Sequence, residues 1–398
     1  PCNCTSMSYA QTMNNFRFYE FFAGGGMARL GLGEGWQCEF ANDFDPVKSN
    51  AYRENWGGQH FCEADINSLR TVDLPGAADL AWASFPCQDL SLAGNALGIG
   101  TADNQTRSGA FWAFWRLMNG LLAEDRAPAC IVLENVYGSL TANGGYDFAL
   151  ICRSLALASY RFGAVMLDAA AFLPQSRPRV FIIAFRADVE IPDTLMACNR
   201  SEGLHPLAME RAVNRLSDVD QQNWIWWRLP LPQNTIPLHH LIDFSEREME
   251  WHSEGETRRL IAMMSPLNAE KLRAMIASGL PQVGTIYKRT RVENGVRVQR
   301  AELRTDGIAG CLRTPGGGSS RQILMFVEKQ CVRSRLLSSR EAARLMGLPD
   351  SYILPARYND AYHLAGDGVA VPVVKHLTRE IVEPVLCFNM SKKLKQAA

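Results

Sequence analysis

The segment FRFYEFFAGGG, residues 16–26, indicates the fold class of this chain. Phe16 to Phe22 has the apolar character of a short strand, and the glycines that follow lead into a helical pattern through Leu30 and Leu32. A glycine-rich turn from a strand into a helix lets backbone N–H groups approach a ligand closely. The alternative interpretation is that the glycines serve only a tight turn that needs positive φ, without a ligand.

The residues that follow continue the alternation of strands and helices. A second strand, Gln37 to Ala41, ends at Asn42 and Asp43, about twenty residues after the glycines, where an acid can bind both hydroxyls of a ribose. A third candidate strand precedes Asp65. Up to about residue 190 this alternation predicts an α/β fold whose mainly parallel sheet is covered on both faces.

Two further predicted strands end in reactive or ionisable residues. Leu80 to Ser84 leads into Phe85-Pro86-Cys87-Gln88, and the apolar run Ile131 to Leu133 is followed by Glu134. Carboxyl ends of parallel strands form the edge at which open sheets bind ligands, although an acid in this position could merely cap a helix. The remaining cysteines are interpreted as inert apolar residues: Cys2, Cys4, Cys38, Cys62, Cys130, Cys152, Cys198, Cys311, Cys331 and Cys387.

Composition excludes several classes of protein. With 398 residues, 47% of them apolar and 21% charged, the chain is long enough for one large or two ordinary domains and is not disordered. No apolar stretch is long enough to span a membrane. Eleven cysteines without a CxxC pair support neither a disulfide framework nor a zinc ribbon, so we expect a cytoplasmic protein without a metal. Residues 1–12 resemble a leader or tag, and no signal peptide is expected.

Charge is unevenly distributed along the chain. Residues 1–150 contain 8 Lys and Arg against 16 Asp and Glu, whereas residues 286–335 contain 11 basic and 4 acidic residues. This asymmetry, a net −8 against a net +7, is typical of a polyanion-binding segment on an acidic body. A solvated surface is the alternative interpretation of the basic run.

Eight blocks between residues 16 and 374 resemble the cytosine-C5 DNA methyltransferase family: FFAGGG, ANDFD, EADI, FPCQDLS, LENV, QSRPR, LSSREAARLMGLPDSY and GDGVAVPVV. The resemblance implies a doubly wound, mainly parallel seven-stranded sheet with one antiparallel strand, and a smaller, irregular target-recognition domain. It also implies methyl transfer from S-adenosylmethionine to carbon 5 of a flipped-out cytosine in a specific duplex DNA sequence.

Roles for individual residues follow from the resemblance. Cys87 is the expected nucleophile at carbon 6 of cytosine, Glu134 with Asn135 holds the base edge, and Arg177 and Arg179 serve the flipped cytosine. The expected cofactor site comprises Phe22, Ala23, Gly24, Gly26, Asp43, Phe44, Asp65, Ile66, Pro86 and Asp367. The glycine-containing stretch Asp89 to Arg107 is interpreted as a mobile lid over the DNA.

The same reasoning divides the chain into a catalytic domain at 13–187, a target-recognition domain at 188–330 and a returning segment at 331–398. A tryptophan cluster at 224–227 is interpreted as core, 268–278 as an amphipathic helix, and Arg344 as a brace between domains. Long cations among glycines and hydroxyls suit phosphate and base-edge contacts. The predicted DNA contacts are Lys288, Arg289, Arg291, Arg313, Ser319, Ser320, Arg321 and Gln322.

Two departures from the family pattern stand out: Asp367 replaces the usual asparagine, and the loop at Arg107-Ser108-Gly109 lacks the usual glycine-threonine order. We expect a monomer that acts on double-stranded DNA and forms no stable complex with any cognate restriction endonuclease in the same cell; the sequence does not reveal whether such an endonuclease is present. The competing interpretations are the same chemistry on transfer RNA, a DNA-binding module without turnover, and an NAD-dependent oxidoreductase. The last of these leaves FPCQ and LENV without a purpose.

Overall fold

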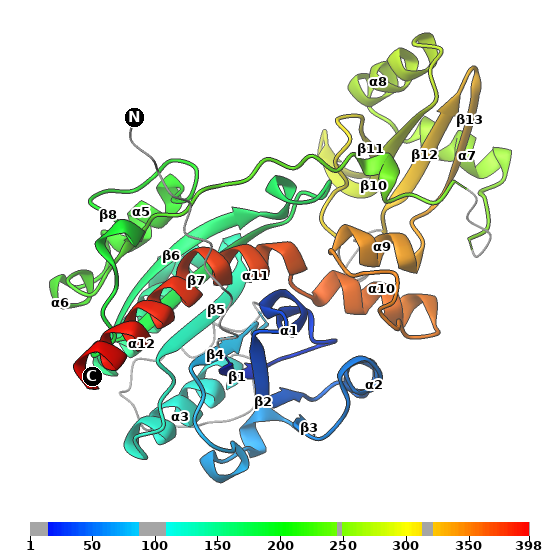
Figure 1. The fold of residues 1–398 in the computed structure, drawn as a ribbon. Coiled ribbons are helices and arrows are strands. Elements are labelled where there is room, and N and C mark those ends of the chain that lie inside the picture. The colour runs from blue at the N-terminus through cyan, green and yellow to red at the C-terminus, as the bar shows by residue number, and fades with distance from the viewer. Residues whose placement is uncertain (1–14, 87–108, 245–248, 313–320, 398) are drawn as a thin grey trace, which may run out of the picture.

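The computed structural model describes residues 15–86, 109–244, 249–312 and 321–397, and its larger part is built on one sheet (Figure 1). Seven strands lie in the order β3-β2-β1-β4-β5-β7-β6, and β7 alone runs antiparallel to its neighbours. The strands are β1 (Phe16–Phe21), β2 (Trp36–Asp43), β3 (Phe61–Glu63), β4 (Leu80–Ala83), β5 (Cys130–Val136), β6 (Tyr160–Asp168) and β7 (Pro178–Arg186). This topology confirms the predicted doubly wound α/β sheet.

Helices cover both faces of the sheet because its strands are apolar on both sides. In β5, Cys130 and Val132 join one buried cluster, and Ile131 and Leu133 join the other. The first face is covered by α1 (Met27–Leu32), α11 (Val371–Leu377) and α12 (Glu383–Ala397), and the second by α3 (Gly109–Ala123) and α4 (Tyr146–Leu157). No helix in the described part of the chain is long and apolar enough to cross a membrane.

The structure extends β5 beyond the predicted strand. The sequence indicates that the apolar run ends at Leu133, but β5 continues through Glu134 and Asn135 to Val136. The reason is its antiparallel partner, because Val136 still pairs with Arg179 of β7. Glu134 therefore lies within a strand, and the alternative that it caps a helix is wrong.

Residues 189–229 pack along the outer strand β6. This segment contains β8 (Met196–Ala197), α5 (Leu207–Val213), α6 (Asp218–Gln221) and β9 (Trp226–Trp227). The Phe162 N–H donates to Asn223 O over 2.9 Å, and the Ile225 N–H donates to Phe162 O over 2.7 Å. Trp227 is fully buried in one hydrophobic cluster, and Trp224 and Trp226 are partly buried against the other. The interpretation of the tryptophan cluster as core is confirmed.

The second part of the molecule contains a regular sheet where the sequence indicated irregular structure. Four antiparallel strands lie in the order β11-β10-β12-β13 and are flanked by α7 (Glu254–Ala262) and α8 (Pro266–Ala277). The strands are β10 (Gln282–Glu293), β11 (Val296–Arg304), β12 (Ile323–Glu328) and β13 (Cys331–Leu336). Helix α8 confirms the predicted helix at 268–278, with Leu272 and Met275 buried. The division at residue 330 remains a prediction, and it falls in the turn between two paired strands.

The two parts are joined through α9 (Ser339–Leu345) and α10 (Tyr358–Asp367), which Figure 1 shows between them. Helix α9 begins with a capping box formed by Ser338 and Glu341. The Glu341 carboxylate also binds the fully buried Arg335 of β13 at 2.7 Å. Arg344 forms an ion pair with Asp350 and donates a hydrogen bond to the carbonyl oxygen of Leu241 over 3.4 Å. It therefore links α9 to the segment between the two sheets.

Gly163 on β6 should be required for the docking of residues 189–229. A Cβ at this position would collide with the carbonyl oxygen of Ile225, which is backbone and cannot rotate away. We expect Gly163→Ala to lower the free energy of unfolding by about 1–3 kcal/mol. Urea denaturation would measure this loss. Gly58→Ala is the control, because a Cβ there meets the nearest side-chain atom at an ordinary 3.7 Å. Equal stability of the two variants would contradict the assignment.

Candidate active site

The loop between β1 and α1 is the first component of the candidate site. Gly24 and Gly26 have φ values of +56° and +76°, which favour glycine. A Cβ on Gly25 would collide with the Tyr352 hydroxyl and one on Gly26 with Trp56, whereas a Cβ on Gly24 would meet nothing within 4 Å. Protein atoms therefore pack closely against Gly25 and Gly26, and the space beside Gly24 is open to a ligand.

The acidic residue predicted to bind a ribose lies beside this loop. The Gly24 N–H donates to Asp43 Oδ2 over 2.8 Å, and the Asp45 N–H donates to Asp43 Oδ1 over 2.9 Å. Burial raises the pKa of Asp43, although these hydrogen bonds and the charge of Lys48 oppose that effect. The structure thus joins Ala23, Gly24 and Asp43 at the carboxyl ends of β1 and β2.

Two aromatic residues and a second acid complete the predicted cofactor residues on this side. Phe44, next to Asp43, is 66% exposed, which is unusual for a ring of this size and suits a stacking surface. Phe22 is half-buried, with a φ of +56°. Asp65 caps the short helical turn Ile66–Ser68 through Oδ1, and the described residues give its Oδ2 no hydrogen bond. Ile66 is buried beneath it.

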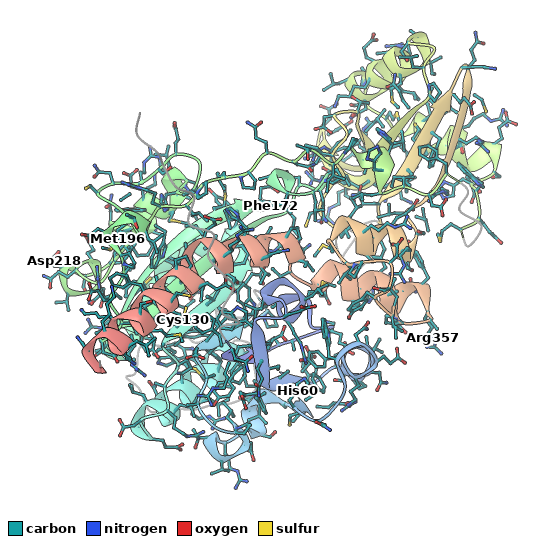
Figure 2. All side chains as sticks on the ribbon, in the orientation of Figure 1. His60, Cys130, Phe172, Met196, Asp218 and Arg357 are labelled. Atoms are coloured by element: carbon teal, nitrogen blue, oxygen red, sulfur yellow. The ribbon has the colours of Figure 1, made fainter. Side chains whose placement is uncertain are left out.

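Glu20 is a feature that the sequence reasoning missed. It is 1% exposed near the end of β1, its Oε1 accepts the Arg29 N–H, and its Oε2 has no hydrogen-bond partner among the described residues. Burial raises its pKa to about 8. Arg29 also contacts Tyr52 and His60, the latter labelled in Figure 2. The available signal was a carboxylate in a strand that is apolar apart from Arg17, four residues before the first glycine.

The second component of the site joins β5 to β7. Arg179 Nε lies 3.1 Å from Glu134 Oε1, and their side chains are only 15% and 10% exposed. The side-chain oxygen of Asn135 accepts the Val136 N–H, and its side-chain amide donates to Phe85 O over 3.4 Å. The second hydrogen bond connects β5 to the segment that leads into the predicted nucleophile loop. Pro86 is exposed at the end of this segment. Cys87 and the predicted lid at 89–107 lie outside the described residues.

Arg177 has a different place from the one predicted. Its guanidinium is 2% exposed and donates to Cys311 Sγ and to the carbonyl oxygens of Leu312, Gly366 and Gly368 over 2.7–3.4 Å. Burial, and then the positive charge of Arg179, lower its pKa. Because both terminal nitrogens of its guanidinium are hydrogen-bonded within the protein, Arg177 connects β7 to residues 311–312 and to the end of α10, and its assignment to the flipped cytosine is not supported.

Asp367 is the last residue of α10 and is paired with a lysine that the sequence reasoning did not single out. Lys48 Nζ lies 2.8 Å from Asp367 Oδ2. Lys48 belongs to α2 (Pro46–Trp56), the helix that begins just after Asp43 and Phe44. The ion pair therefore connects two of the predicted cofactor segments.

The predicted DNA contacts have mixed positions. Lys288, Arg289 and Arg291 lie on β10, and the two arginines face Glu302 of β11. Arg321 contacts Asn359 and lies over the Tyr358 ring. Gln322 is 2% exposed, so its assignment as a DNA contact is wrong in this structure. Arg313, Ser319 and Ser320 lie outside the described residues. Among the residues that are described, no three His, Cys, Asp or Glu side chains are grouped to hold a metal.

Known proteins share this arrangement of motifs and fold. The family model described as C-5 cytosine-specific DNA methylase matches residues 16–383. The chain is 32% identical to the type II methyltransferase M.HaeII of Haemophilus aegyptius, over 97% of this chain and 98% of that one. It is 25% identical to M.HhaI of Haemophilus parahaemolyticus, over 93% and 95%. The crystal structure of the S. pombe Dnmt2 methyltransferase is similar in fold, with a TM-score of 0.54 at 18% identity over 94% of this chain and 98% of that one.

The different surroundings of the two arginines predict different effects of the same substitution. Arg177→Lys removes the planar set of donors and leaves several buried carbonyl groups unpaired, so we expect a loss of about 2 kcal/mol in the free energy of unfolding. Arg179→Lys keeps a charge near Glu134 and should cost less than about 1 kcal/mol. Chemical denaturation of both variants measures the difference, and equal losses would refute the structural role of Arg177.

Proposed function

Because the chain belongs to the C-5 cytosine-specific DNA methylase family, we propose that it transfers the methyl group of S-adenosylmethionine to carbon 5 of a flipped-out cytosine in duplex DNA. The observation that carries the proposal is the placement of Glu134 and Arg179 on β5 and β7, in the same sheet whose β1 and β2 carry the glycine loop and Asp43. This placement supports a site for the base and a site for the methyl donor on the same sheet.

The residues of the first component fit S-adenosylmethionine. The open space at Gly24 suits close approach of a ligand to the backbone, Asp43 is beside it, and the exposed ring of Phe44 offers a surface for an adenine. Asp65 would accept the adenine amine, with Ile66 packed next to it. When bound, the cofactor supplies an electrophilic methyl group on a sulfonium.

The proposed chemistry explains the residue types of the second component. Carbon 5 of cytosine is a poor nucleophile until the conjugation of the ring is broken, and addition of the Cys87 thiolate to carbon 6 would do this. Glu134, oriented by Arg179 and adjacent to Asn135, would hold the ring at nitrogen 3 and disperse the charge that the addition creates. Carbon 5, now an enamine carbon, would then take the methyl group from the sulfonium as the bond between methyl and sulfur breaks, leaving a thioether. Loss of the proton from carbon 5 and expulsion of Cys87 would give 5-methylcytosine and the free enzyme.

Attack on carbon 6 comes from above the ring plane, so the cytosine must leave the base stack. The same requirement holds for the alternative substrate, transfer RNA. Comparison of methyl transfer from labelled cofactor to duplex DNA and to transfer RNA separates the two. A non-catalytic DNA-binding protein would transfer no label to either.

A covalent trap tests Cys87. A 5-fluorocytosine at the target position should hold the protein on the DNA after methyl transfer, because fluorine cannot leave as a cation. We expect an adduct that survives denaturing electrophoresis and that requires S-adenosylmethionine for efficient formation. The adduct should vanish in Cys87→Ser, because a hydroxyl is far less acidic than a thiol.

Two variants make the trapping experiment specific. Glu134→Gln keeps the shape of the side chain but cannot exchange a proton with the base, so it should slow trapping about 10²-fold or more while DNA binding remains. Cys198→Ser is the matched control, because Cys198 is an exposed cysteine far along the chain from the site motifs and should trap normally. An adduct that persists in Cys87→Ser would show that another cysteine is the nucleophile.

The basic β10–β11 hairpin gives a second test through salt. We expect DNA affinity to fall steeply between low and physiological salt, because cations on this hairpin would release counterions from several phosphates. Lys288→Ala should lower the slope of log affinity against log salt by about 0.9 for the phosphate contact it loses. Lys392 lies on α12 and is paired with Glu190, so Lys392→Ala should leave the slope unchanged. A slope that does not differ between the two variants would place the DNA elsewhere.

A further inference from the structure

An ion pair joins two helices that are far apart in the sequence. Lys48 of α2 and Asp367 of α10 are separated by 319 residues, and their charged atoms lie 2.8 Å apart. The side chains are 22% and 41% exposed, so both retain access to solvent or to a ligand. A pair as exposed as this contributes little to stability by itself.

Each charge lies at the helix end that disfavours it. Lys48 is the third residue of α2, which begins at Pro46, and a helix N-terminus carries a partial positive charge. Asp367 is the final residue of α10, where the partial charge is negative. The opposite arrangement, an acid at 48 and a lysine at 367, would form the same bridge and suit both helices better. Helix stability therefore does not account for the polarity of the pair.

The pair lies beside the glycine loop. The charge of Asp43, whose carboxylate receives the Gly24 N–H, acts on Lys48. On the other side, Gly368 follows Asp367 and approaches so close that a Cβ there would collide with Met27, the first residue after the glycines. Both partners are thus next to residues that contact the loop expected to lie under the methionine part of the cofactor: Lys48 is near Asp43, and Asp367 precedes Gly368.

We propose that Lys48 and Asp367 together bind the amino-acid end of S-adenosylmethionine, with Lys48 contacting its carboxylate and Asp367 its ammonium group. This inference rests on the proposed function and adds to it a binding residue, Lys48, and a reason for the polarity of the pair. An ammonium has three donors and a carboxylate about four lone pairs, so each can keep its partner while binding the ligand. Four alternating charges then form a closed network.

The pair also accounts for the aspartate at position 367. A lone carboxylate there would repel the carboxylate of the ligand as much as it attracts the ammonium group. With Lys48 bonded to it, the added negative charge is matched by a positive one, and the two ends of the zwitterion meet opposite charges. The competing interpretation is a simple bridge between α2 and α10 that does not touch the ligand.

Calorimetry with two ligands separates these interpretations. S-adenosylmethionine carries the amino-acid end, and 5′-methylthioadenosine has the same adenosine part without it. Lys48→Met should weaken S-adenosylmethionine binding about tenfold or more and change 5′-methylthioadenosine binding by less than about twofold. The matched control is Lys392→Met, which breaks another lysine–carboxylate pair between distant segments and should change neither affinity.

The reversed double variant, Lys48→Asp with Asp367→Lys, is the sharpest test. It keeps the bridge, so its thermal melting temperature should equal or exceed that of the native protein. Its affinity for S-adenosylmethionine should nevertheless fall at least as far as that of Lys48→Met. Native affinity in the reversed variant, or equal losses for both ligands in either variant, would overturn the inference. If the native protein binds neither ligand, the cofactor assignment itself is wrong and the inference falls with it.

Discussion

The guanidinium of Arg177 is the interaction on which the arrangement of this molecule depends. A cation that is almost completely buried needs hydrogen-bond acceptors, because an unpaired buried charge is very costly, and the two terminal nitrogens of Arg177 have them. The acceptors come from two directions: residues 311 and 312, which lie between β11 and β12, and the glycines at the end of α10. The neighbouring Gln175, also fully buried, donates to Leu345 O of α9. The motif QSRPR therefore connects β7 to α9, to the end of α10 and to residues 311–312. Only its last arginine, Arg179, lies beside Glu134.

Much of the catalytic part could be predicted from the sequence. The strands, their parallel order and the glycine loop depend on local patterns of apolar residues and glycine, which act over short distances and are visible in one chain. The same is true of the capping box of α9, because Ser338 and Glu341 are three residues apart. Family resemblance then supplied the roles of Asp43, Phe44 and Glu134, and the structure brings these residues to strand ends or paired strands of one sheet.

The parts that could not be predicted depend on pairing between distant residues. The recognition sheet was missed because β10 and β11 form a hairpin whose arginines face acids across the strands, so its charge pattern resembles that of a loop. Gln322 was assigned to DNA from its place beside Arg321, but the turn into β12 directs it inward, where its backbone N–H meets the Tyr362 hydroxyl. Lys48 has no local signature at all. Its ion pair with Asp367 becomes visible only when α10 returns to the loop at the other end of the chain.

The packing of residues 189–229 against β6 has a consequence for how the protein behaves at high concentration. A sheet that ends in a bare strand offers unpaired backbone groups to any other chain, and such edges promote aggregation. Here the segment at 223–225 occupies part of that edge through hydrogen bonds with Phe162, and Leu204 O accepts the N–H of Met166. The opposite edge, β3, is only three residues long. Both edges of the central sheet are thus protected from pairing with a strand of a second molecule. Loss of the docked segment would expose the β6 edge and promote aggregation even if the active site remained intact.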